Sequence, residues 1–123
     1  MVDDAAMIMT WNRLTEAFRQ GDMATFESAF ADQFNGSMND LAMPRDVFFR
    51  AIRQGRQRGW TGQHVVSISA RANVLTTHYY NTFNDGTITE GAAVAMFNDD
   101  GKIVAIRALT TQPRSIQPIA AEP

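Results

Sequence analysis

The 123-residue chain is predicted to fold as one α+β domain, with helices packed on one face of a mainly antiparallel sheet. Apolar residues recur at helical spacing only before Trp60, whereas the chain beyond Gly62 is rich in Val, Ile, Thr, Tyr and Phe. Short turns with Asp-Gly pairs separate the later strand-like segments. Helices segregated from a run of strands indicate the α+β class.

The first helix is predicted from one apolar stripe. Met7, Trp11, Leu14 and Phe18 recur at spacings of four, three and four, and the pattern ends at Gly21. Such a stripe buries one face of an amphipathic helix against a core. We therefore expect an N-terminal helix that packs on the sheet.

A second, short helix is predicted after Asp22, whose carboxylate can accept a backbone hydrogen bond as an N-cap. Its apolar stripe consists of Phe26, Ala29 and Phe30. The next segment, 33–40, contains Asn and Gly and is interpreted as a brief strand or irregular crossing.

A third helix is predicted to begin at Pro44, because the missing N–H of proline would be unpaired in a first turn anyway. Val47, Phe48, Ala51 and Ile52 are expected to form its buried face. Five of the eleven basic residues fall on this helix and its end: Arg45, Arg50, Arg53, Arg56 and Arg58. They fit either a solvated helix face or a surface that guides an anionic substrate to a pocket mouth.

Four strands are predicted in the second half of the chain, at 65–72, 74–83, 87–97 and 103–111. Asp-Gly pairs make the last two connections hairpins, and 71–73 is a further corner. We expect residues 1–112 to form the single domain. The segment 113–123 contains three prolines and is expected to be a mobile tail that cannot continue a ladder.

Composition argues against several classes of function. The net charge of −2 comes from mixed acidic and basic residues, so no global field attracts nucleic acid. The chain contains no Cys, which suits a cytoplasmic location and excludes thiolate chemistry. The N-terminus lacks the pattern of a signal peptide or membrane span. The two histidines and scattered acids show no metal-ligand spacing, and no cofactor is implied.

The order of these elements resembles the nuclear transport factor 2-like superfamily, which includes ketosteroid isomerases and SnoaL-like polyketide cyclases. The resemblance rests on Gly21-Asp22, on the Phe-Ala-Asp triplet at 30–32 and on the closing hairpin at 97–109. It implies a cone-shaped α+β barrel, in which three N-terminal helices and a curved sheet enclose one apolar pocket. It also implies a homodimer formed through the outer sheet face.

The isomerase chemistry of that family is not predicted here. It needs a carboxylate base and two donors, a Tyr and a protonated Asp, around a dienolate oxygen. Counted from the shared motifs, these positions fall on Met38, Leu14 and Ala93, and all three are apolar. The acid of the cyclase branch would fall at 107–109, where the chain has none.

Other residues are candidates for chemistry. Strand alternation places His78 and Tyr80 on one face, which the isomerase-like register turns inward, where they could act as base and donor. Asp40 lies in a loop near the expected mouth of the cone. Each has a plain structural alternative: a sheet His or Tyr that bonds a neighbour, and a solvated or capping carboxylate. Glu90 and Arg107 are expected to pair on the outer face.

The sequence thus favours a protein that binds a small hydrophobic molecule, and leaves open whether it is an isomerase, lyase or cyclase. The expected pocket residues, besides His78 and Tyr80, are Leu14, Phe18, Met38, Ala93, Ala95, Ile106 and Ala108. The small alanines among them leave volume for a ligand. The alternatives are a non-catalytic dimeric module whose outer sheet face is the working surface, and an accessory subunit of a larger enzyme.

Overall fold

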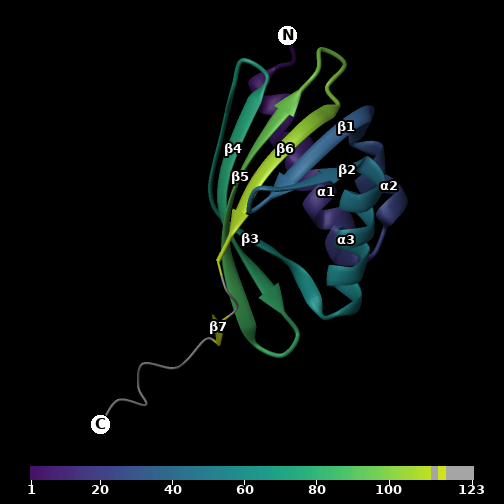
Figure 1. Cartoon of the computed structure of the whole chain (residues 1–123). Coiled ribbons are helices and arrows are strands. Elements are labelled where there is room, and N and C mark those ends of the chain that lie inside the picture. Colours follow the sequence, from purple (N-terminus) through teal and green to yellow (C-terminus); the bar gives the residue numbers. More distant parts are fainter. Residues whose placement is uncertain (112–113, 116–123) are drawn as a thin grey trace.

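The computed structural model describes residues 1–111 and 114–115 of the chain. Its helices all lie on one side of a curved sheet, as Figure 1 shows. The helices are α1 (Asp4–Gln20), α2 (Met23–Ser28) and α3 (Arg45–Gln57). The strands are β1 (Phe30–Met38), β2 (Leu41–Pro44), β3 (Trp60–Arg71), β4 (Val74–Phe83), β5 (Thr87–Phe97), β6 (Ile103–Thr110) and β7 (Arg114–Ser115).

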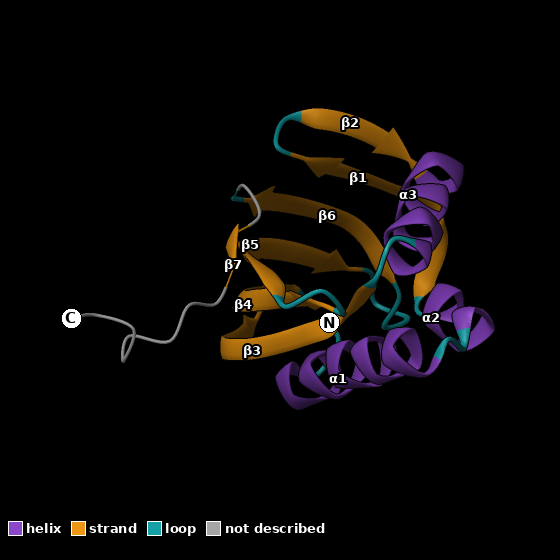
Figure 2. Ribbon diagram, turned by 90° about the horizontal axis from the view of Figure 1, so that it is seen from below, coloured by secondary structure: helices purple, strands orange, loops and turns teal. Residues whose placement is uncertain are grey.

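The sheet is mixed and open. Its strands follow the order β2-β1-β6-β5-β4-β3, and β7 pairs with β5 off this path. Only the β1–β6 pairing is parallel among the described strands. The expected α+β class and mainly antiparallel sheet are confirmed, but the sheet does not close into a barrel. The helices are also not all N-terminal to the strands, because β1 and β2 precede α3 (Figure 2).

The helix ends follow the local chemistry of the sequence. Gly21 ends α1 with a left-handed φ of 79°, and its N–H bonds the carbonyls of Ala17 and Phe18. The Asp22 carboxylate accepts from the Thr25 N–H at 3.1 Å and so caps α2. Bonds from the side chain and backbone of Thr25 hold the pKa of Asp22 below its ordinary value. Both helix boundaries were predictable from sequence.

Two expected apolar stripes differ from the structure. Phe30 begins β1 instead of extending α2, which ends at Ser28. On α3 the buried residues are Phe48, Phe49 and Ile52, while Val47 is 36% exposed. The helix is therefore rotated relative to the expected face, because Phe49 offers more apolar surface to the core than Val47 does.

Aromatic rings fill much of the space between the sheet and the helices. Phe30 and Phe34 meet edge to face with their ring centroids 4.9 Å apart. The ring of Phe48 lies 4.9 Å from that of Phe34, and Phe18 packs on Trp60 at 4.2 Å. Such tilted ring pairs stabilise a core beyond the area that they bury.

The predicted turns are confirmed. Gly86 and Gly101 adopt left-handed φ angles of 85° and 81° in the β4–β5 and β5–β6 connections. Ala72 and Asn73, with φ of 53° and 66°, form the two-residue link between β3 and β4. The chain between β3 and β6 is therefore a meander of antiparallel hairpins.

Part of the expected tail pairs with the sheet. Arg114–Ser115 forms β7, which lies antiparallel to Thr87 and Ile88 at the start of β5. The expectation that the tail cannot continue a ladder is thus wrong for these two residues. The rest of the tail, for which mobility is the expectation, lies outside the described residues. None of the described helices is both long and apolar enough to cross a bilayer.

Candidate functional site

The inward face of β4 differs from the expected one. Leu75, Thr77, Tyr79 and Asn81 are buried, while the residues that alternate with them, His78 among them, lie on the outer face. The expectation that His78 and Tyr80 point into the interior is wrong. The pairing with β5 is the cause, because residues directly opposite one another in a sheet share a face.

Tyr79 lies opposite Gly91, and Thr77 lies opposite the inward-facing Ala93. A Cβ atom added at Gly91 would sit 2.5 Å from Cε2 of Tyr79. The missing side chain at Gly91 therefore leaves the room that the phenol ring occupies. Burial raises the pKa of Tyr79 to about 12, so its hydroxyl is neutral over the physiological range.

His78 forms a pair on the outer face of the sheet. Its Nε2 lies 2.6 Å from Oε2 of Glu90, and its ring centroid is 5.8 Å from that of Tyr80. Glu90 and Arg107 do lie on the outer face, as expected, but Glu90 bonds His78, whereas Nη1 of Arg107 lies 3.5 Å from Oδ1 of Asn35. Arg107 lies directly opposite Val94 on β5, so it is not the cross-strand neighbour of Glu90.

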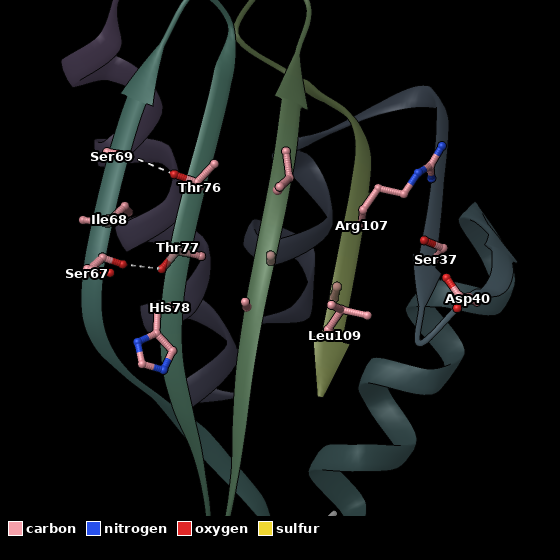
Figure 3. Close-up of a pocket in the computed structure, with 14 residues that line it drawn as sticks. Ser37, Asp40, Ser67, Ile68, Ser69, Thr76, Thr77, His78, Arg107 and Leu109 are labelled. Carbon is pink, nitrogen blue, oxygen red and sulfur yellow. Dashed lines mark hydrogen bonds between the residues drawn. The ribbon is translucent and has the colours of Figure 1, made fainter. Parts of the chain in front are cut away.

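Asp40 also belongs to the outer face. It occupies the β1–β2 turn with a φ of 68° and lines a shallow groove of about 550 Å³ on the sheet surface. Figure 3 shows Asp40 and Ser37 beside Arg107 at one side of this groove, with Ser67 and His78 at the other. Asp40 therefore does not stand at the mouth of the interior, because the two-residue turn directs it to the other face.

The interior cavity, which lies between the sheet and the helices, has a volume of about 60 Å³. Six of the seven expected pocket residues line it: Leu14, Phe18, Met38, Ala93, Ile106 and Ala108. The seventh, Ala95, is fully buried but lies away from the cavity. Further lining comes from Trp11, Thr15, Phe26, Phe30, Phe48, Ile52, Trp60, Gln63 and Tyr79.

Two polar atoms of this lining are buried without a partner. Within the described part of the chain, neither the indole Nε1 of Trp11 nor Oε1 of Gln63 makes a hydrogen bond. Trp11 is only 3% exposed. A buried polar group without a hydrogen bond lowers the stability of a protein by about 1–3 kcal/mol. Such groups therefore commonly bond to a water molecule or a ligand. The lining of the cavity therefore includes two residues, Trp11 and Gln63, that each bury one polar atom without a partner.

The lining does not support proton transfer of the isomerase kind. The positions expected for its Tyr, base and second donor, Leu14, Met38 and Ala93, all line the cavity, and all are apolar. As far as the structure describes the chain, no carboxylate, imidazole, ammonium or guanidinium group lines it either. The arrangement is suited to holding a molecule and orienting it through Trp11 and Gln63.

Comparison of the sequence with known proteins gives no relative. No family model matches the chain. No curated protein matches it either.

Comparison of the structure gives clear similarities. A nuclear transport factor 2-like protein of unknown function from Burkholderia xenovorans superposes with a TM-score of 0.74 at 16% identity, over 96% of this chain and 92% of that one. A candidate ketosteroid isomerase from Kribbella flavida gives 0.74 at 11% identity, over 96% and 87%. IdmH, a candidate polyketide cyclase from Streptomyces antibioticus, gives 0.73 at 15% identity, over 85% and 91%. The fold of this chain is thus nuclear transport factor 2-like.

Proposed function

We propose that this chain, with its nuclear transport factor 2-like fold, binds a small molecule whose buried part is neutral and mainly apolar. The observation that carries the proposal is the apolar interior cavity with one unpaired donor, Nε1 of Trp11, and one unpaired acceptor, Oε1 of Gln63. A molecule that accepts a hydrogen bond from Trp11 and donates one to Gln63 satisfies both atoms.

The ligand part inside the cavity is neutral because, within residues 1–111 and 114–115, no charged side chain lines the cavity to pair with it. Removing an unpaired ion from water costs several kcal/mol even after the protein relaxes. Apolar walls and neutral polar atoms instead favour a ring or short chain that carries a carbonyl or hydroxyl group. The small side chains of the alanines at 93 and 108 leave part of the space between the sheet and the helices unfilled.

The volume limits the size of the buried part. The cavity of about 60 Å³ is far below the roughly 300–1,000 Å³ of typical ligand pockets. A cavity needs about 15 Å³ to hold one water molecule, so this cavity has room for only a few non-hydrogen atoms. A larger ligand requires a rotation of lining side chains such as Trp60, which is only partly buried.

Intrinsic fluorescence tests the proposal directly, because both tryptophans of the chain, Trp11 and Trp60, line the cavity. We would titrate the protein with cyclohexanone, cyclohexanol and methylcyclohexane and follow fluorescence and melting temperature. The two oxygenated compounds should bind and raise the melting temperature, and the hydrocarbon should bind more weakly. Each probe is larger than the cavity, so its binding also requires a side chain such as Trp60 to rotate. No response to any of the three up to their solubility limits would refute a cavity that opens to a ring-sized ligand.

The Trp11→Phe variant removes the donor and keeps an aromatic ring in place. Losing one buried hydrogen bond of about 1.4 kcal/mol should weaken cyclohexanone binding about tenfold. Trp60 remains as the fluorescent reporter. Val94→Ala, on the outer sheet face, is the matched control and should leave the affinity unchanged.

A homodimer through the outer sheet face is the second proposal, and it is supported by the apolar residues that this face exposes. Val66, Val94 and Leu109 are 51%, 36% and 62% exposed. Burying such residues against a second copy removes apolar area from water. Sedimentation equilibrium should show a dimer that Leu109→Glu dissociates. The control variant Met9→Glu changes a residue of α1 that is 61% exposed, and it should remain a dimer. A monomeric parent protein would contradict the homodimer proposal.

We further propose a cytoplasmic location, supported by the absence of cysteine from the sequence. His78 and Asp40 remain candidates for chemistry only in the outer-face groove that they line, and Tyr80 only through its ring contact with His78. A native mass spectrum of protein purified from its own source would reveal a retained ligand. It would also reveal a larger partner, as the accessory-subunit alternative requires.

A further inference from the structure

A second pocket adjoins the interior cavity at Trp60. This surface pocket of about 260 Å³ is lined by Arg19, Arg56, Gly59, Trp60, Thr61 and Asn84. Trp60 also lines the interior cavity. One residue therefore lines both spaces. We call this surface pocket the vestibule.

The position of Trp60 is set by the elements around it. Its ring packs on that of Phe18 with centroids 4.2 Å apart, and its Nε1 donates to the Gly62 carbonyl at 3.1 Å. A Cβ atom at Gly55 would lie 2.9 Å from Cε3 of Trp60, so the indole rests directly on the backbone of α3. Trp60 is only partly buried. The ring thus packs against α1 and α3 where the vestibule and the cavity adjoin.

The vestibule carries positive charge. Arg56 donates from Nε to the Phe18 carbonyl at 3.0 Å and forms no ion pair with any described residue. Arg19 pairs with Glu16 at 2.7 Å. Two guanidinium groups and one carboxylate leave a net positive charge. Nη2 of Arg56 also lies 3.5 Å from the Arg19 carbonyl, to which it donates, so the guanidinium is held in place at the end of α1 by two bonds. A guanidinium fork matches the geometry of a carboxylate.

We propose that the ligand of the interior cavity is an amphiphile with a carboxylate, and that Arg56 and Arg19 bind this carboxylate in the vestibule while the apolar part passes Trp60. This inference rests on the proposed function, because it assigns the charged end of the same ligand. It also gives a role to part of the arginine cluster on α3, of which Arg56 is the member that lines the vestibule.

The test compares two probes of equal chain length, hexanoate and 1-hexanol, by tryptophan fluorescence at low salt. Both should bind, and hexanoate should bind about tenfold more tightly, because charge-assisted hydrogen bonds are stronger than neutral ones. The preference should shrink as salt is added, since the site is open to solvent and therefore screened.

Arg56→Gln removes the charge and should reduce the preference for hexanoate to less than about twofold, while hexanol affinity stays unchanged and shows that the fold is intact. Arg19→Gln is the second variant and should lower the preference in part. Arg50→Gln, also exposed on α3 but away from the vestibule, is the matched control and should keep the full preference.

The outcomes separate the two proposals. Equal affinity for hexanoate and hexanol would overturn the vestibule inference and leave the cavity function standing. A hexanoate preference that survives both Arg56→Gln and Arg19→Gln would also overturn it. Binding of hexanol without hexanoate would likewise overturn the vestibule inference alone, whereas failure of both probes to bind the parent protein would refute both proposals together.

Discussion

Raising the pH above 10 is expected to destabilise the fold through Tyr79. Burial raises the pKa of this phenol from 10.0 to about 12 in the folded state. Below pH 10 the hydroxyl is protonated in both states and contributes no pH dependence. Between about 10 and 12 the unfolded chain loses the proton while the folded chain keeps it. The folded state then binds more protons, so the free energy of unfolding falls as pH rises.

The magnitude follows from the separation of the two pKa values. At pH 11 the ionisation favours the unfolded state about tenfold, which lowers the free energy of unfolding by about 1.4 kcal/mol. The complete loss, reached above pH 12, corresponds to two pKa units or about 2.7 kcal/mol. Urea unfolding at pH 9 and pH 11 measures the difference.

Two variants isolate Tyr79 from other alkaline effects. Tyr79→Phe should lose the 1.4 kcal/mol component, while Tyr80→Phe, which alters the outer face, should retain it. Both variants keep the same lysine and arginine residues as the parent, so the background titration cancels. The reverse result, with the component lost only in Tyr80→Phe, would show that β4 faces the other way and would refute the register described above.

Further substitutions test the same strand pair. Leu75→Ala, at a side chain with no exposure, should cost about 2–5 kcal/mol in urea unfolding. Val74→Ala, 37% exposed on the opposite face, should cost less than about 1 kcal/mol, and equal costs would contradict the alternation. Gly91→Ala places a Cβ 2.5 Å from the Tyr79 ring and should cost about 1–3 kcal/mol. In a Tyr79→Leu background that cost should shrink, and an unchanged cost would argue against the contact.

The elements with strong local signals were predictable from the sequence. The stripe from Met7 to Phe18 and the glycine that follows it define α1, since helix faces and helix ends depend on neighbouring residues. The Asp-Gly turns define the meander for the same reason. The short strand β2 was missed because its residues are mostly exposed and carry no alternation, with Leu41 at 64%. It pairs with β1 across the turn at Asn39 and Asp40.

The face of β4 was recoverable in principle. A three-residue turn, 84–86, joins β4 to β5, and Thr82 pairs with Ile88 across it. Odd-numbered residues of β4 then lie opposite odd-numbered residues of β5, and opposite residues share a face. Because Ala93 points inward, Thr77 and Tyr79 must point inward too. The inward position of Ala93 and the length of this turn together fix the inward face of β4. The expected face was shifted by one residue, which exchanged Tyr79 for His78 on the cavity side.

The sequence by itself determined the α+β class and the main helices and hairpins, because each depends on periodicity or turn residues within one segment. The six expected residues that line the cavity came from the resemblance to a known family and its register. The tertiary structure alone decided which polar atoms meet there. Trp11 comes from α1, Gln63 from β3 and Tyr79 from β4, and their convergence depends on strand register and on an irregularity between Val65 and Ser67. Pairing and packing between distant segments set that geometry, and no local pattern encodes it.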